Sequence, residues 1–483
     1  MSMVPVRCLD ILPHHLVLDM CASPGSKTGQ VLEALHGGGG GLPEGGVVAC
    51  EPNLARATNL YGNIAEFKSP CLMVVSHPGQ AFPDLTLADG KEVQYDHIVC
   101  DVPCSGDGTI RKNPNIWLDW HPARGNGRFN LQLNIARRGV ELLKEGGTMA
   151  YSSCSINQIE NEAVVAQLLR EAGGSLQLED MTARFPGLRW LPGLSSWRVF
   201  DSQSREYEAM EAVPDNLHSQ IRPEMFPPSA AETKAFNLDR CMRFLPHLND
   251  DGGFFVAVLK KTGPVKTTPK HKERSDRKES QRKKPKYSKA KLEHFIGSFD
   301  DFEFMNEAPD YHTEVRQSLE YLGVELPSSN LYKNKVCGNN VRLVSDSLRQ
   351  LMHPGNNHLK VGSNPGVKIL DRNSLSCKDK VPFHPNSAFN HVTSNLNSKR
   401  QVHGNIHDVE QLLNTPTISL TDVSDSLRSQ LGELEPGLVI FSFQSEDERN
   451  VRLTCPGFFS RNKLVIHLER RAPSHYKFLL GLK

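Results

Sequence analysis

The sequence predicts an α/β fold with a largely parallel sheet in the first half of the chain, and a small β-rich domain towards its C-terminal end. Between residues 15 and 261, short apolar runs alternate with stretches of helical periodicity, which is the pattern of a parallel sheet. Polar turns rich in Gly, Pro and Cys follow several of these runs. Hydrophobic residues make up 38% of the 483 residues, which is enough apolar side chain for at least one full core.

Six apolar runs are predicted to be the strands of this sheet. They are residues 15–20, 47–50, 71–75, 97–100, 148–151 and 253–259. Stretches with helical spacing lie between them, at residues 27–35, 54–67, 129–143 and 160–172. We expect the third helix to stop at Gly146-Gly147, because glycine is a common signal at helix C-termini. Residues 184–248 are rich in Trp, Pro and Arg and predict no single long element.

Composition divides the chain into three expected parts. Residues 1–261 are expected to be the domain that holds the sheet. Residues 262–335 are expected to be a basic linker, largely disordered, since residues 260–291 hold fourteen Lys or Arg and three acidic residues. Residues 336–483 mix short strand-like runs with turns and are expected to form the small β-rich domain.

The basic segment also bears on where the protein acts. Arg282-Lys-Lys-Pro-Lys286 is its densest cluster, and clusters of this kind bind nucleic acid or direct nuclear import. We therefore expect the protein in the nucleus, with the nucleolus as a candidate.

The composition excludes two classes of protein. No run approaches the roughly 18 apolar residues of a membrane span, and the N-terminus lacks the basic and apolar regions of a secretory signal. The eleven cysteines are an odd number without the regular spacing of a disulfide framework. We therefore expect an intracellular protein with free thiols and no membrane segment.

The first candidate binding site is the turn after the first predicted strand. Residues 18–28 read Leu-Asp-Met-Cys-Ala-Ser-Pro-Gly-Ser-Lys-Thr, so a strand ends in a turn and a helix begins at once. Such a turn lets backbone N–H groups and a helix N-terminus approach a ligand. The segment is neither GxGxxG nor a P-loop, which disfavours a nucleotide-phosphate site, and an ordinary strand-to-helix turn is the alternative. Glu51 follows the second strand, where an acidic residue is placed to bind the ribose hydroxyls of an adenosine-type cofactor.

Two thiols follow neighbouring strands of the predicted sheet. Asp101-Val-Pro-Cys-Ser-Gly-Asp-Gly-Thr109 comes directly after the strand at 97–100, and Cys154 follows the next strand. Because the carboxyl ends of parallel strands meet at one edge of a sheet, we expect Cys104 and Cys154 at the same rim. Two buried structural cysteines are the alternative. A zinc site is disfavoured because Cys100, Cys104 and Cys154 lack a fourth ligand at finger spacing, so no metal is expected.

Three motifs, in their order along the chain, resemble those of the Sun-type RNA cytosine-5 methyltransferases. They are Cys21-Ala-Ser-Pro-Gly-Ser-Lys-Thr28, Asp101-Val-Pro-Cys104 and Tyr151-Ser-Ser-Cys-Ser155. The resemblance is closest to the eukaryotic tRNA-modifying branch, covers roughly residues 5–262, and extends to a tail that looks like a diverged PUA-like region. It implies a Rossmann-like S-adenosylmethionine-dependent methyltransferase with a PUA-like C-terminal domain. The implied enzyme is a monomer that forms 5-methylcytosine in tRNA, with other RNA as a further candidate substrate.

The resemblance also implies roles for individual side chains. Cys154 would add covalently to cytosine C6, and Cys104 would help to remove the C5 proton or to release the adduct. Asp101 and Lys27 would hold the polar edge of a base flipped out of its helix. The first turn would cradle the methionine part of S-adenosylmethionine, with Glu51 at the ribose and Asp101 also near the cofactor. The residues of that turn are Cys21, Ala22, Ser23, Pro24, Gly25, Ser26 and Lys27.

Three departures from the family pattern stand out. The family usually has Asp where this chain has Glu51, and an Asp near the adenine amine where this chain has Pro78. Proline has no side-chain acceptor for that hydrogen bond. The chain starts about fifteen residues before the first predicted strand, where the family has a long RNA-binding extension, so we expect slow catalysis on full-length tRNA.

Two other functions compete with this one. A non-catalytic RNA-binding relic of the family would explain the short segment before the first predicted strand and the proline at residue 78, although both thiols and their motifs are retained. A DNA cytosine methyltransferase shares the Pro-Cys dipeptide. In those enzymes, however, the Pro-Cys thiol is itself the nucleophile, and a second motif like residues 151–155 is not expected.

Overall fold

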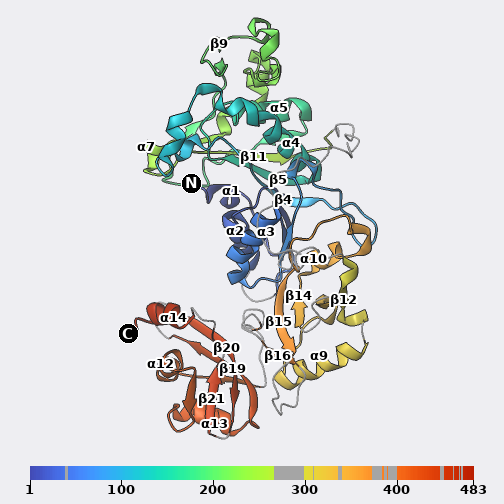
Figure 1. The fold of residues 1–483 in the computed structure, drawn as a ribbon, viewed down its shortest axis with the longest axis vertical. Coiled ribbons are helices and arrows are strands. Elements are labelled where there is room, and N and C mark those ends of the chain that lie inside the picture. The colour runs from blue at the N-terminus through green and yellow to red at the C-terminus, as the bar shows by residue number, and fades with distance from the viewer. Residues whose placement is uncertain are drawn as a thin grey trace, which may run out of the picture.

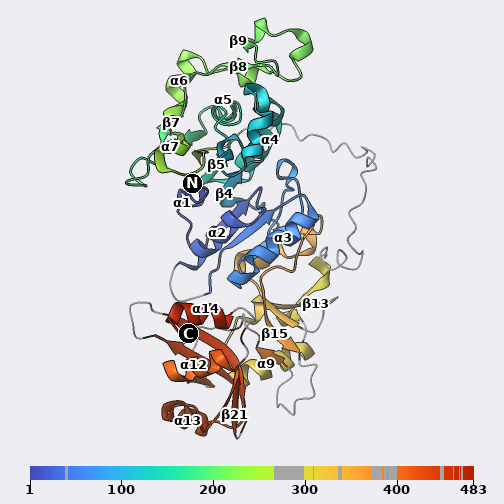
Figure 2. The same cartoon turned by 60° about the vertical axis from the view of Figure 1, so that its left-hand side comes forward.

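The computed structural model describes residues 1–37, 42–265, 299–307, 309–335, 340–372, 383–385, 389, 400–445, 451–460, 462–466, 468 and 472–482. The described chain forms three larger sheets, and Figures 1 and 2 both show the second and third side by side below the first. Most of the basic segment, including residues 282–286, lies outside the described residues.

The first sheet has a parallel centre and the strand order β3-β2-β1-β4-β5-β11-β10-β7. Its parallel strands are β1 (Leu16–Asp19), β2 (Gly46–Cys50), β3 (Leu72–Val75), β4 (Tyr95–Asp101) and β5 (Leu143–Ser153). The antiparallel strands beyond β5 are β11 (Phe254–Lys261), β10 (Met242–Phe244), β7 (Leu191–Pro192) and β6 (Leu176–Leu178), which pairs with β11. The helices that connect strands are α2 (Ser26–His36), α3 (Leu54–Ile64), α4 (Asn126–Leu142) and α5 (Glu162–Ala172).

This architecture confirms the predicted α/β fold and its Rossmann-like sheet. Strands β1, β2 and β3 are buried along their whole length, which is why each appears in the sequence as a continuous apolar run. All six predicted strands are present.

The glycine pair after the third predicted helix has another role than the one predicted. Helix α4 ends at Leu142, and the pair Gly146-Gly147 lies inside β5. Gly146 has φ +81°, a conformation that favours glycine, and the pairing of β4 with β5 shifts register between Tyr95 and His97. The glycines therefore allow the irregular backbone at the start of β5 and do not end the helix.

The second half holds two further sheets, and the first of them begins before residue 336, where the small β-rich domain was expected to begin. The second sheet is antiparallel and consists of β12 (Phe302–Phe304), β13 (Leu331–Asn334), β14 (Asn340–Leu343), β15 (Val367–Arg372) and β16 (Phe383–Pro385). The third has the order β17-β19-β20-β21-β18. Its strands are β17 (Gln401–His403), β18 (Thr417–Ser419), β19 (Gly437–Gln444), β20 (Arg452–Phe459) and β21 (Lys463–Ile466). The helices beside it are α12 (Ile406–Asn414), α13 (Asp425–Gly432) and α14 (Ala472–Leu480).

The second sheet begins inside the range 262–335 that was expected to be a linker. Strands β12 and β13 lie there, together with α9 (Pro309–Leu322). Val315, Leu319 and Leu322 are spaced as one face of a helix and are buried. The face is narrow and the residues around it are polar, so the helical periodicity is weak in the sequence.

A segment of the second half completes the first domain. Helix α10 (Asp346–Leu351) places Leu348 in the same buried core as Val48 of β2. Val361 forms a bridge with Val75, and Ser76 N–H donates to the Lys360 carbonyl at 2.8 Å. The segment thereby covers the outer edge of β3, whose unpaired backbone would otherwise face solvent.

The described residues include nine cysteines, all of them free thiols. Six are buried, and the three that are not, Cys21, Cys104 and Cys154, follow β1, β4 and β5 at the same edge of the first sheet. No helix in the described ranges is both long and apolar enough to cross a membrane.

Candidate active site

The two predicted thiols meet at the carboxyl ends of β4 and β5. The strands are parallel neighbours with Asp101 opposite Ser152, so the turns that follow them start from the same edge. Cys104 Sγ lies 3.2 Å from Cys154 Sγ, within hydrogen-bonding distance for sulfur. Both side chains are half-buried in polar turns, which disfavours the alternative of two structural core cysteines.

The two thiols are electrostatically unequal. The hydrogen bond from Cys104 lowers the pKa of Cys154, against the effect of burial, and the same bond together with burial raises the pKa of Cys104. Of the two nearby charges, the Asp101 carboxylate raises the pKa of Cys154, and the Lys27 ammonium, with a smaller effect, lowers it. Cys154 is therefore the member of the pair that more readily becomes a thiolate, and Cys104 the member that keeps its proton.

An ion pair lies beside the thiols. Lys27 Nζ is 2.7 Å from Asp101 Oδ2, and Ser152 Oγ donates to Asp101 Oδ1 at 2.7 Å. Lys27 also lies over the ring of Phe254, with Nζ 5.2 Å from the ring centroid. The arrangement fixes an ammonium and a carboxylate side by side, so the site offers both a donor and an acceptor to a polar ligand edge.

A buried carboxylate, Glu160, joins the two cysteine turns. It accepts hydrogen bonds from Ser105 N–H at 2.8 Å, from Ser155 Oγ at 2.7 Å and from Gln132 Nε2 at 3.0 Å. Glu160 is fully buried, and Ser105 and Ser155 directly follow the two cysteines. Nothing in the sequence marks Glu160 beyond its place as the first residue of the helix predicted over 160–172; in the structure it lies in the turn before α5.

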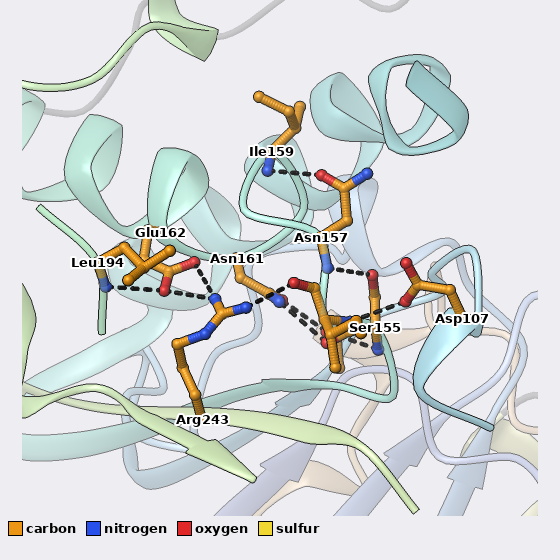
Figure 3. Close-up of polar contacts among 10 residues, drawn as sticks. Asp107, Ser155, Asn157, Ile159, Asn161, Glu162, Leu194 and Arg243 are labelled. Carbon is orange, nitrogen blue, oxygen red and sulfur yellow. Dashed lines mark hydrogen bonds and ion pairs between the residues drawn. The ribbon is translucent and has the colours of Figure 1, made fainter. Parts of the chain in front are cut away.

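A second buried network holds the turn after β5. Figure 3 shows Arg243, from β10, between Glu162 and that turn. Arg243 Nη1 lies 2.6 Å from Glu162 Oε1, and its Nη2 donates to the Ile156 carbonyl at 2.7 Å. Asn161 Nδ2 donates to the Ser155 carbonyl at 2.9 Å. Because each polar group is buried and satisfied, the turn that carries Cys154 has little freedom to move.

Three backbone segments approach closely around Gly108. Its N–H donates to the Cys154 carbonyl at 3.0 Å, and its carbonyl accepts from Gly253 N–H at 2.7 Å. A Cβ at Gly108 would lie 2.5 Å from the Gly253 oxygen and 2.7 Å from the Cys154 oxygen. Asp107 Oδ1 adds a bond from Ile156 N–H at 2.8 Å, so the loop after β4 and the turn after β5 are held as one unit.

A cavity of about 430 Å³ opens beside Cys154. Its walls include Cys154, Thr109, Arg111, Lys112, Gly253 and Phe254. Asp250 and Asp251 also line it, so the thiol faces a space with an aromatic wall and both cationic and acidic side chains.

The turn after β1 forms a cradle of backbone at the same edge. Gly25 has φ +112° directly before α2, and a Cβ there would lie 2.8 Å from Cγ2 of Ile64. Burial raises the pKa of Cys21, so this third thiol stays protonated. In the described ranges, no group of three or more His, Cys, Asp or Glu side chains is placed to hold a metal ion.

Two buried carboxylates test whether the implied cofactor fits. Asp19 Oδ2 accepts from Thr28 Oγ1 at 2.7 Å, Oδ1 has no hydrogen-bond partner among the described residues, and burial raises the pKa of this carboxyl to about 6. Glu51, at the end of β2, is only 2% exposed and accepts from Asn53 N–H at 2.9 Å. Carboxylates at neighbouring strand ends, above a backbone cradle, fit a cofactor such as S-adenosylmethionine that carries hydroxyl and ammonium donors.

The chain is similar to known proteins over nearly its whole length. Residues 6–185 match the family described as 16S rRNA methyltransferase RsmB/F. The tRNA (cytosine(34)-C(5))-methyltransferase of Drosophila melanogaster is 34% identical over 518 residues, which cover 99% of this chain and 68% of that protein. The multisite-specific tRNA:(cytosine-C(5))-methyltransferase of Saccharomyces cerevisiae is 32% identical over 482 residues, covering 94% and 68%. A protein of the same description from Schizosaccharomyces pombe is 40% identical over 287 residues, covering 55% and 42%.

Proposed function

This chain belongs to the RsmB/F-type family of S-adenosylmethionine-dependent RNA cytosine-5 methyltransferases, and we propose that it forms 5-methylcytosine in tRNA through a covalent bond from Cys154. The observation that carries the proposal is the pair of thiols 3.2 Å apart beside a cavity, with the pKa of Cys154 lowered by Cys104. The intact thiol pair and ion pair oppose the alternative of a non-catalytic relic. Methyl transfer to tRNA in vitro tests the activity, and the cysteine variants considered in the Discussion test the mechanism.

C5 of cytosine is too poor a nucleophile to take a methyl group by itself, so the protein must first activate the ring with a nucleophile of its own. The Cys154 thiolate adds to C6, and the electron pair of the C5–C6 bond becomes available at C5. S-adenosylmethionine supplies a methyl group as an electrophile. A base, water or Cys104, then takes the C5 proton, the electron pair of that C–H bond re-forms the C5–C6 double bond, and Cys154 departs as a thiolate. Cys104, in contact with Cys154, is placed to assist this release.

The Lys27–Asp101 pair would hold the polar edge of the flipped-out base. Asp101 can accept a hydrogen bond from the cytosine amine, and Lys27 can donate to the ring carbonyl, which draws electrons away from C6. Ser152 fixes the orientation of Asp101. The backbone of residues 21–27 and the carboxylate of Glu51 would hold the cofactor, as the resemblance implies.

Cofactor affinity should rise when Pro78 is replaced by aspartate. Pro78 is exposed and follows β3, next to His77, whose Nε2 accepts from Lys360 N–H at 2.8 Å. A carboxylate at this place can accept a hydrogen bond from the adenine amine, and one such contact contributes about 1 kcal/mol, or severalfold in affinity. Calorimetry of S-adenosylmethionine binding to wild type and Pro78→Asp measures the difference.

The matched control for this change is Pro78→Ala, which removes the proline ring without adding an acceptor. It should bind the cofactor as wild type does. Equal affinity of all three proteins would show that residue 78 does not contact the adenine.

We also propose that the basic cluster at residues 282–286 directs the protein to the nucleus. The support is its sequence alone, four cationic side chains in five residues, because it lies outside the described residues. A fluorescent fusion in which all four are changed to Ala should move to the cytoplasm. The same number of changes elsewhere in the segment serves as the control, at Lys266, Lys270, Lys272 and Arg274. A fusion that stays nuclear without the cluster would remove its role in import.

A further inference from the structure

Two exposed tryptophans lie a short stretch of chain beyond the thiol site. Trp117 lies in the 3-10 helix η4 (Pro114–Asp119), and Trp120 directly follows it. Their ring centroids are 6.4 Å apart and their planes are 15° from parallel. Trp117 is 67% exposed and Trp120 45%, and Leu118 between them is 80% exposed. By contrast, Trp197 is buried and donates its indole N–H to a backbone carbonyl. Exposed aromatic surface of this kind marks a place where a partner binds.

The tryptophan segment is anchored to the wall of the active site. Within residues 111–120, Ile116 is the only residue that is not exposed. Its Cδ1 lies 3.6 Å from the position that a Cβ of Gly106 would take, and that position is 4.0 Å from Cys154 Sγ. A nucleotide that reached Cys154 would therefore bring its neighbours in the strand close to the two indole rings.

Cationic side chains connect the active-site cavity to the tryptophans. Arg111 and Lys112 line the cavity beside Cys154 and precede η4 by only a few residues. Arg111 Nη1 lies 2.8 Å from Asp250 Oδ1, but both side chains are largely exposed. An exposed ion pair of this kind contributes little stability, so a phosphate can replace the aspartate.

We propose that Trp117 and Trp120 form a stacking platform for an unpaired nucleobase of the RNA substrate, beside the cytosine to be methylated, with Arg111 and Lys112 at its phosphate. The identity of the substrate as RNA rests on the proposed function. Single-stranded nucleic acid fits the surface because every base has a stacking face and the backbone is anionic. A cytosine that leaves its helix also leaves its neighbours unstacked, and the platform replaces the lost stacking.

The experiment is a titration of the full chain with a labelled eight-nucleotide oligocytidylate, followed by anisotropy and by tryptophan fluorescence. Wild type should bind with quenching of the indole emission, because stacked bases quench exposed tryptophans. Trp117→Ala should weaken binding between about fivefold and a hundredfold, the range for loss of one stacked base, and should remove most of the quenching. Trp117→Phe should retain most of the affinity, since it keeps an aromatic face.

Leu118→Ala is the matched control, because it removes an even more exposed side chain from the same segment without removing a ring. It should leave affinity and quenching unchanged. Unchanged affinity and quenching in a Trp117→Ala/Trp120→Ala double variant would overturn the proposal and would assign the patch to a protein partner instead.

Methyl transfer to tRNA, measured in parallel, separates this inference from the proposed function. A wild-type protein that binds the oligonucleotide with quenching but transfers no methyl group would contradict the function and leave the platform standing. In an active enzyme, Trp117→Ala should raise KM for tRNA by about fivefold or more while kcat changes less, since it removes binding and not chemistry. A fall in kcat with unchanged KM would count against the platform.

Discussion

Cys104→Ala is expected to trap a protein–RNA adduct that survives denaturation, whereas Cys154→Ala is expected to abolish adduct and product together. Cys154 is the thiol whose pKa is lowered and which faces the cavity, so it is the one placed to form the bond to C6. Cys104, 3.2 Å away, is then needed for release. Denaturing gels with radiolabelled tRNA detect the adduct, and methyl transfer should fall by about a thousandfold or more in each variant.

The hydrogen bond between the thiols adds a pH dependence to this result. In Cys104→Ala, Cys154 loses the hydrogen bond that lowers its pKa, so the pKa of Cys154 rises towards that of an ordinary thiol. Less thiolate is then present at neutral pH, so the adduct forms slowly there and faster as pH is raised from about 7 to about 9.

Cys71→Ala is the control for a general effect of removing a cysteine. Cys71 is buried directly before β3, at the end of the strand away from the rim, and its loss should leave the rate and the absence of a stable adduct unchanged. An adduct in Cys154→Ala and none in Cys104→Ala at any pH would reverse the two roles.

The rim of the first sheet could be predicted from sequence because its signals are local. Strands buried on both faces appear as continuous apolar runs, and the residue after each parallel strand reaches the same edge whatever its loop does. This was enough to place Cys104 and Cys154 together, and the family resemblance implied that Lys27 and Asp101 lie beside them.

The contacts that fix the rim could not be predicted, because they join residues far apart in the chain. Glu160 binds Ser105, which lies 55 residues before it, and Arg243 binds Glu162 across 81 residues. In the sequence each is an ordinary charged residue, and only the pairing makes its burial favourable. The burial of Leu348 could not be predicted for the same reason, because it depends on a core formed by the distant strands β1 and β2.

Gly108→Ala is expected to lower kcat by about a hundredfold, although the substitution adds a single methyl group far smaller than any catalytic side chain. The new Cβ would stand 2.5 Å from the Gly253 oxygen and 2.7 Å from the Cys154 oxygen, and neither backbone atom can rotate away. The loop after β4 and the turn after β5 must therefore separate. A displacement of about 1 Å at a reacting group lowers the rate by about a hundredfold.

Several measurements keep this prediction separate from simple unfolding. Gly127→Ala is the matched control, since its Cβ in α4 would meet nothing within 4 Å, and it should leave activity intact and raise stability by up to about 1 kcal/mol. In Gly108→Ala, overpacking should cost about 1–3 kcal/mol of stability, while S-adenosylmethionine affinity stays near that of wild type because the turn after β1 and Glu51 are untouched.

Adduct yield in a Gly108→Ala/Cys104→Ala double variant should fall together with kcat, since Cys154 itself has moved. A wild-type rate in Gly108→Ala would mean that the close approach of the three backbones does not position the nucleophile, and that the buried Glu160 and Arg243 networks suffice to hold it.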